Sequence, residues 1–175
     1  STLLASSAAS DVYKRQGNYI DAIGYYNEAI AVAPTMPYLY LLRAYVQEYG
    51  FENRAEAEAD YRKVLSLDDQ STYYGDNLKG IAFARLHQPQ EMARWESRLL
   101  QSGTVRNIDY FYLACMYAMT DADKAIGYLE KALQSGFGDY NRIAIDRYSS
   151  VSLLPVRHLT PYSELLQRYH SLFGK

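Results

Sequence analysis

The sequence has little of what several common classes of protein need. Its 175 residues include one cysteine, Cys115, so the chain can form no internal disulfide and no metal site built from cysteines. No apolar run approaches ~18 residues, so we expect no membrane-spanning helix. No run of Lys or Arg exceeds two residues and the net charge is −2, which argues against nucleic acid as a partner. The single cysteine fits a reducing compartment, and we expect a cytoplasmic protein.

The residue patterns of common active sites are also missing. The histidines, His87, His158 and His170, are far apart and do not have the spacing of metal ligands. The chain contains no Gly-rich phosphate-binding loop and no GxSxG motif. No histidine lies near Cys115 in the sequence to activate its thiol. Carboxylates are frequent on the expected helix surfaces, but none forms an isolated pair in apolar surroundings. We therefore expect no enzyme, no cofactor and no metal.

Tyrosine is in excess, with 19 residues against five Phe and one Trp. A Tyr ring has a large apolar face and a polar tip, so it suits a half-buried groove or an interface. Alternatively, many of these tyrosines replace Phe in the packing between helices. The composition alone does not separate the two interpretations.

A trio of small, large and small residues recurs along the chain at helical spacing. It first occurs as Ala22, Tyr26 and Ala29, between Gly17 and Pro34. Later copies follow after steps of 35, 35 and 33 residues: Ala57, Tyr61 and Val64; Met92, Glu96 and Leu99; Ala125, Leu129 and Ala132. A fixed period in this range predicts stacked helical hairpins, and hence an all-α fold. The third copy is the most divergent, because Glu96 stands where the first two have Tyr.

Turn and cap residues predict where the helices begin and end. Three prolines are expected in the first turn of a helix, a favoured place for proline: Pro37, Pro89 and Pro161. Asn53 and Glu56 have the spacing of a helix cap, and Gly136 is expected to end a helix. Gly80 is expected at a close contact between helices. Residues 151–159 contain a proline and are expected to form an extended linker.

Residues 1–16, STLLASSAASDVYKRQ, differ from the rest of the chain. Part of this stretch resembles a translated adapter or linker, so we expect it to be non-native and leave it out of the fold prediction. Alternatively, residues 1–16 are the remnant of a signal peptide, but the apolar core of this stretch is far too short for one. A third interpretation is a weakly amphipathic first helix of the first repeat.

The repeated residues resemble those of the tetratricopeptide repeat family. That pattern has a small residue in helix A, then an alanine, an aromatic and an alanine in helix B, then a proline. The first repeat matches it with Ala22, Tyr26, Ala29 and Pro34, whereas the second departs at Val64 and the third matches weakly. The stretch LACMYAMTDADKAIGYLEKALQSGF and the segment after it resemble the end-of-group module of some bacterial arrays of these repeats.

The resemblance implies a right-handed superhelix of antiparallel helix pairs, an α-solenoid closed by a C-terminal capping helix. It covers roughly residues 17–170, and the expected organisation is four repeats followed by a cap: 17–36, 37–70, 71–106, 107–138 and 139–175. Family membership also implies that partners bind on the concave face, which A helices mostly form. We therefore expect a non-catalytic scaffold for protein interactions.

The expected binding surface is a Tyr-rich concave face that takes a peptide or protein segment. Its candidate residues lie on the A helices: Tyr38, Leu41, Leu42, Tyr45, Tyr74, Asn77, Arg85, Phe111, Tyr112 and Cys115. Some members of the family clamp a C-terminal carboxylate with Lys, Asn and Arg, but here only Asn77 and Arg85 are polar, so we do not expect that ligand. Two alternatives stay open: a self-associating module, and a regulatory fragment of a longer enzyme or sensor.

Overall fold

The computed structural model describes residues 18–67, 77–139, 143 and 153–170. The chain forms two compact units, Ser1–Asp69 and Gln70–Lys175. All regular structure longer than a turn in the described residues is helical, which confirms the all-α class. The expectations for residues 1–16 and for Tyr74 lie outside the described residues, as does part of the expected cap, 139–175.

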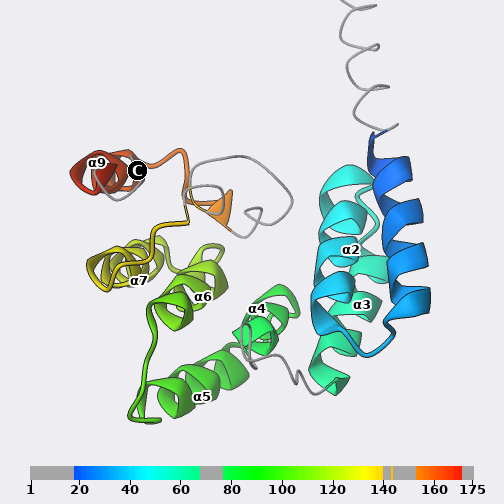
Figure 1. Ribbon diagram of the computed structural model, residues 1–175, viewed down its shortest axis with the longest axis horizontal. Coiled ribbons are helices and arrows are strands. Elements are labelled where there is room, and N and C mark those ends of the chain that lie inside the picture. Colours follow the sequence, from blue (N-terminus) through cyan, green and yellow to red (C-terminus); the bar gives the residue numbers. More distant parts are fainter. Residues whose placement is uncertain (1–17, 68–76, 140–142, 144–152, 171–175) are drawn as a thin grey trace, which may run out of the picture. The chain divides into compact units, whose positions relative to one another are not determined.

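Three helices lie in the described part of the first unit, and Figure 1 shows them side by side: residues 18–32, α2 (Pro37–Gly50) and α3 (Arg54–Ser66). α2 and α3 pack against each other, and the short turn between them makes the pair antiparallel. The repeated trio of α3, Ala57, Tyr61 and Val64, is fully buried. These small and large side chains fill the contact between the helices, as the repeat predicts.

A polar contact joins these three described helices. The Arg43 guanidinium donates to both carboxylate oxygens of Asp60, from Nε at 2.8 Å and from Nη2 at 2.7 Å. Its Nη1 donates to Asn27 Oδ1 at 2.7 Å. Arg43 lies on α2, Asp60 on α3 and Asn27 on the helix 18–32. A planar guanidinium that binds a carboxylate at two points fixes geometry as well as charge.

The second unit contains α4 (Asn77–Arg85), α5 (Pro89–Leu100), α6 (Asn107–Tyr117), α7 (Ala122–Gln134) and α9 (Thr160–Arg168). α4 packs against α5 and α6, α6 packs against α7, and α7 contacts α9 (Figure 1). The trio of α7, Ala125, Leu129 and Ala132, is buried. The rings of Phe111 and Phe137 stack with centroids 4.6 Å apart and close the turn after α7 onto α6.

Gly80 sets how closely α4 can approach its neighbours. A Cβ at this position would lie 2.9 Å from Trp95 Cδ1 on α5 and 3.1 Å from Met116 Sδ on α6. Both distances are shorter than ordinary contacts between heavy atoms. The absence of a side chain therefore lets α4 lie against both helices at once, which confirms the close contact expected at Gly80.

Most of the predicted helix boundaries are confirmed. Pro37, Pro89 and Pro161 lie in the first turns of α2, α5 and α9. The side chain of Asn53 accepts a hydrogen bond from the Glu56 N–H at 3.4 Å and caps α3. Gly136, with φ of 86°, follows the end of α7 in the left-handed conformation typical of a helix stop.

The prediction of an extended linker is wrong for the described residues 153–159. They form consecutive tight turns, with hydrogen bonds from Val156 N–H to Leu153 C=O and from Leu159 N–H to Val156 C=O, both at 3.1 Å. Leu153 and Val156 are buried. Pro155 lacks an N–H but has the φ that turns need, so it is compatible with this path.

Two hairpin turns contain the same unusual backbone conformation at equivalent positions. Glu52, between α2 and α3, has φ of 53°, and His87, between α4 and α5, has φ of 54°. The two residues are 35 positions apart, which equals the period of the repeated trio. Side chains with a Cβ rarely adopt this conformation, because the Cβ crowds the neighbouring carbonyl oxygen.

Glycine at one of these turns should stabilise the protein. We expect His87→Gly to raise the free energy of unfolding by about 0.5–1 kcal/mol, since glycine adopts positive φ without the Cβ contact. Urea denaturation followed by circular dichroism measures the change. The matched control is Gly136→Ala, which adds a Cβ at positive φ and should lower stability by about 1 kcal/mol. A destabilised His87→Gly variant would contradict the backbone assigned to this turn.

Candidate functional site

The structure places the predicted groove residues mainly inside the units. Tyr38 is half-buried, and Tyr74 lies outside the described residues. The other candidates are at most 8% exposed: Leu41, Leu42, Tyr45, Asn77, Arg85, Phe111, Tyr112 and Cys115. Side chains with so little exposed area contribute packing between helices. Their role as partner contacts stays a prediction.

Asn77 and its neighbours show what the buried polar residues do. Asn77 Nδ2 on α4 donates to Asp109 Oδ1 on α6 at 2.7 Å. Asp109 also accepts from the backbone N–H of Arg106 at 2.8 Å and from its Nη2 at 2.7 Å. Burial alone would raise the pKa of Asp109, but the bonds from Arg106 and Asn77 outweigh it and the pKa is lowered. The group joins α4 to the start of α6.

Glu96 on α5 is the centre of a second polar cluster. Its carboxylate accepts from Tyr117 Oη at 2.8 Å, from Lys124 Nζ at 2.7 Å and from Tyr128 Oη. Tyr117 lies on α6, and Lys124 and Tyr128 lie on α7. The Glu96 side chain is 13% exposed. One carboxylate therefore ties three helices together.

The pKa shifts in this cluster favour a structural role. Burial by itself raises the pKa of Glu96. The hydrogen bonds from Lys124, Tyr128 and Tyr117 lower this pKa by more than burial raises it, so the net shift is downward. The pKa of Tyr128 is raised, first by burial and then by Glu96. The pKa of Lys124 is raised by Glu96 and Tyr117 despite burial. Every shift moves a group away from neutral pH, whereas a catalytic acid or base needs a pKa near it.

The sequence contained one signal for this cluster. Glu96 interrupts the repeated trio at the position where Tyr26 and Tyr61 stand. The structure shows that tyrosines from the neighbouring helices supply the aromatic rings instead: Tyr117 and Tyr128 stack with centroids 6.1 Å apart. The departure from the pattern is therefore compensated by partners that lie 21 and 32 residues away.

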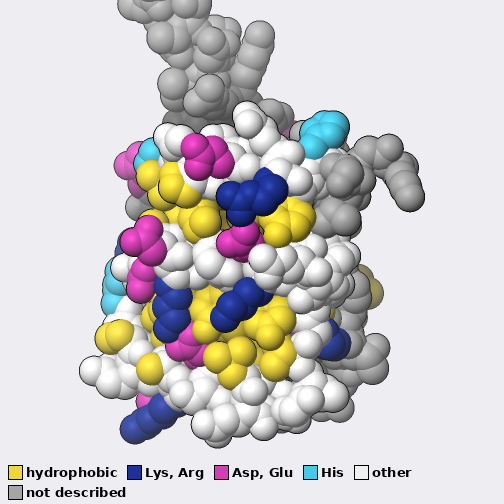
Figure 2. Space-filling model, turned by 90° about the vertical axis from the view of Figure 1, so that its left-hand side faces the viewer, with side chains coloured by type: hydrophobic (Ala, Val, Ile, Leu, Met, Phe, Trp, Pro, Cys, Tyr) yellow, Lys and Arg dark blue, Asp and Glu magenta, His cyan; other side chains and the backbone are white. Residues whose placement is uncertain are grey.

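Lysines lie over these tyrosine rings. Lys124 Nζ lies 4.0 Å from the centroid of Tyr117, and Lys131 Nζ lies 5.1 Å from that of Tyr128. Figure 2 shows one face of the molecule on which Lys and Arg side chains lie over patches of hydrophobic side chains. Such contacts hold the charge at the surface while the ring beneath it stays covered.

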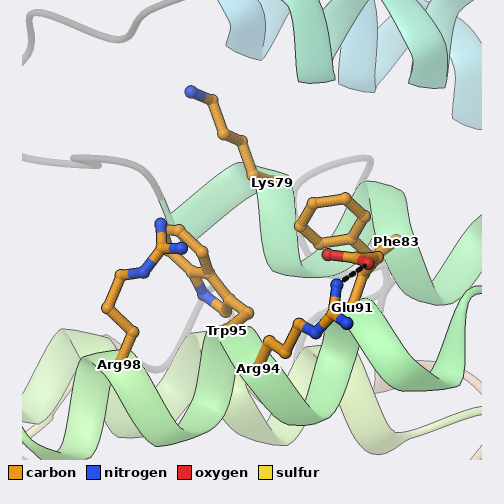
Figure 3. A pocket seen from close by; sticks show the side chains of 6 residues that line it. All are labelled: Lys79, Phe83, Glu91, Arg94, Trp95 and Arg98. Atoms are coloured by element: carbon orange, nitrogen blue, oxygen red, sulfur yellow. Dashed lines mark hydrogen bonds and ion pairs between the residues drawn. The ribbon is translucent and has the colours of Figure 1, made fainter.

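A cluster of accessible, chemically distinctive side chains lies along α5. Arg98, Trp95 and Arg94 project from α5 toward α4, which contributes Phe83 and Lys79 (Figure 3). With Glu91 they line a hollow of about 100 Å³. We name these six residues the α5 surface. Trp95 and Phe83 are half-buried, whereas Arg94 and Arg98 are exposed.

The α5 surface has an excess of positive charge. It contains three cations and one carboxylate, and that carboxylate, Glu91, is bound by Arg94 at 2.7 Å (Figure 3). The guanidinium carbon of Arg98 lies 5.8 Å from the Trp95 ring centroid, and among the described residues Arg98 has no carboxylate partner. Arg94 and Arg98 also line a second, shallow hollow with Ala93, Ser97 and Gln101. Exposed Arg beside Trp is typical of residues that dominate protein interfaces.

The carboxylate of Glu96 should make stability depend on pH. We expect Glu96→Gln to lower the free energy of unfolding at pH 7 by about 1–3 kcal/mol, because charged hydrogen bonds are lost in a largely buried place. The lowered folded-state pKa stabilises the protein above the ordinary Glu pKa of about 4.3, and this contribution is lost as the pH falls through the lower folded value.

Urea denaturation of the parent and of Glu96→Gln at pH 7 and at about pH 3 measures this dependence. The difference in free energy of unfolding between the two proteins should be smaller at the acid pH. Exposed Glu28 provides the control, since Glu28→Gln should change little at either pH. An equal loss from Glu96→Gln at both pH values would contradict an ionised Glu96.

Among the described residues, no group of three or more His, Cys, Asp or Glu could hold a metal ion. None of the helices there combines the length and the apolar character needed to cross a membrane. Comparison with known proteins finds no matching family model, no matching curated protein and no matching solved structure.

Proposed function

We propose that this chain is a non-catalytic scaffold of tetratricopeptide-like helical hairpins that binds a segment of another protein. The hairpins α2–α3 and α4–α5, with equivalent turn residues 35 positions apart, support the repeat assignment. Stacking of such hairpins in a right-handed superhelix, closed by α9, belongs to this proposal. So does a cytoplasmic location, which rests on the single cysteine.

The observation that carries the proposal is the α5 surface. Trp95 and Phe83 offer apolar area around a hollow, while Arg94 and Arg98 offer charge on flexible side chains at the same place. Positive charge favours an acidic partner, and aromatic rings favour one that also has apolar side chains. A single-stranded nucleic acid would also meet rings and cations, but the chain has a net charge of −2, whereas nucleic-acid binders usually have a basic excess.

The spacing of the arginines suggests a simple partner chemistry. Arg94 and Arg98 are one helical turn apart, so their Cα atoms are separated by about 6 Å along the axis. In an extended peptide, alternate side chains on one side are separated by about 6.6 Å. An extended segment with acidic residues at alternate positions and apolar residues between them therefore matches the α5 surface.

Trp95 provides a direct test, because it is the chain's one tryptophan and its fluorescence reports this surface alone. The probe is a 12-residue peptide of alternating Asp and Leu with both ends capped, so that its carboxylates are all side chains. We expect a saturable change in Trp95 fluorescence. Arg94→Gln/Arg98→Gln should weaken binding at least about tenfold, since both charges are removed.

Two controls make the result specific. Arg62→Gln/Lys63→Gln removes the same charge from exposed positions of α3 and should leave peptide binding unchanged. A peptide with Lys in place of Asp should not bind. Equal binding by the parent and the α5 variant, or no binding by the parent, would refute this site.

A further inference from the structure

One face of the helix 18–32 has the opposite charge to the α5 surface and, like it, contains exposed apolar residues. Its exposed apolar residues include Tyr25 and Val32, with 67% and 87% of their area exposed. Asp21 and Glu28 are also exposed, and the segment contains no Lys or Arg. The four positions follow an i, i+4, i+7, i+11 pattern, so they lie on one side of the helix. We name them the acidic face.

Tyr25 and Val32 are exposed to an extent that is unusual for large apolar residues gathered on one face. Such faces commonly mark contacts with another protein. On the same helix, Tyr26 is 7% exposed and Asn27 is bound by Arg43 of α2. The helix thus uses its other side to pack into its own unit, which leaves the acidic face directed away from it.

We infer that the acidic face of one chain docks on the α5 surface of a second copy. This inference rests on the proposed function for the surface and for the acidic, partly apolar chemistry of the partner, and it makes the partner segment a helix instead of an extended peptide. Asp21 and Glu28 lie about 10 Å apart along the helix axis, a span that the long, flexible side chains of Arg94 and Arg98 can reach from positions about 6 Å apart. The exposed Tyr25 and Val32 would cover the apolar area at Trp95 and Phe83. Opposite charges on the two faces favour encounter and set which surfaces pair.

The contact joins two different surfaces, so after the first pairing one copy still has its α5 surface available and the other still has its acidic face. Head-to-tail contacts produce rings or open chains, and two copies that exchange both contacts form a closed two-fold dimer. We therefore expect association that grows with protein concentration and that salt weakens, because salt screens exposed charges over distances of about 8 Å at physiological ionic strength.

Sedimentation velocity of the full chain tests the inference. The mean mass of the parent should rise between about 10 µM and about 1 mM, the range in which weak contacts form, and added salt should lower it. Asp21→Lys/Glu28→Lys alone should stay monomeric, as should Arg94→Glu/Arg98→Glu alone, because each then carries like charges on the two faces.

An equimolar mixture of the two charge-reversed variants is the decisive sample. It contains both complementary pairings, the reversed one and the original one, so association should return to the level of the parent. Recovery in the mixture also shows that both variants are folded. The matched control, Arg62→Glu/Lys63→Glu, makes the same change of net charge at exposed positions of α3 and should associate like the parent, because both of its docking surfaces are unchanged.

Each alternative result overturns the inference. A parent that stays monomeric at ~1 mM, or a mixture that fails to recover, excludes docking between copies. Association that both single variants retain places the contact elsewhere. If self-association fails while the capped Asp–Leu peptide still binds at Trp95, the partner is another acidic protein and the proposed function stands. If the peptide also fails, the proposed function fails with it.

Discussion

The close approach of three helices at Gly80 is the constraint on which the second unit depends. α4 can lie against both α5 and α6 because nothing projects from Gly80 toward Trp95 and Met116. Atoms Cδ1 and Nε1 of the Trp95 ring lie close to Gly80, and the guanidinium of Arg98 lies over the same ring. A packing requirement in the interior thereby determines how an aromatic ring is presented at the surface. The fold and the proposed binding site are therefore not independent features of this chain.

Charged side chains complete what apolar packing begins. Interiors made of small and large apolar residues hold helices together but allow neighbouring helices to slide, since apolar contacts are not directional. The carboxylates of Asp60, Asp109 and Glu96 each accept hydrogen bonds from a different helix. Because a buried carboxylate without its donors is costly, each one selects a single relative position of the helices it joins. Apolar residues at helical spacing thus bring neighbouring helices together, and a few ionic contacts determine how those helices are positioned along one another.

Features that depend on neighbouring residues could be predicted from the sequence, and features that depend on distant ones could not. Prolines and Gly136 act through their own φ angles, so the helix boundaries followed directly from local chemistry. The same period placed Leu41 and Tyr45 on one face of a helix, yet it could not say what covers that face, and both are buried. The partners of Glu96 lie on other helices, and the accessibility of Arg94 and Arg98 depends on how α4 packs over α5. The helical period of the sequence indicates which residues lie on the same side of a helix, whereas the solvent exposure of that side depends on how the helices pack in the folded unit.

The polar clusters have a consequence for how such a chain can change over time. Arg43 with Asp60, Asn77 with Asp109, and Glu96 with Tyr117 and Tyr128 each join residues that are distant in sequence. Replacing one member leaves the other buried without its partner, so the two substitutions are strongly coupled in free energy. Relatives of this chain should therefore keep these residues as pairs or replace both members of a pair together. Solvent-facing positions beside them should be substituted independently of one another. Such paired variation would allow the hairpins of a related sequence to be aligned with those of this chain even where the residues of the repeated trio are no longer recognisable.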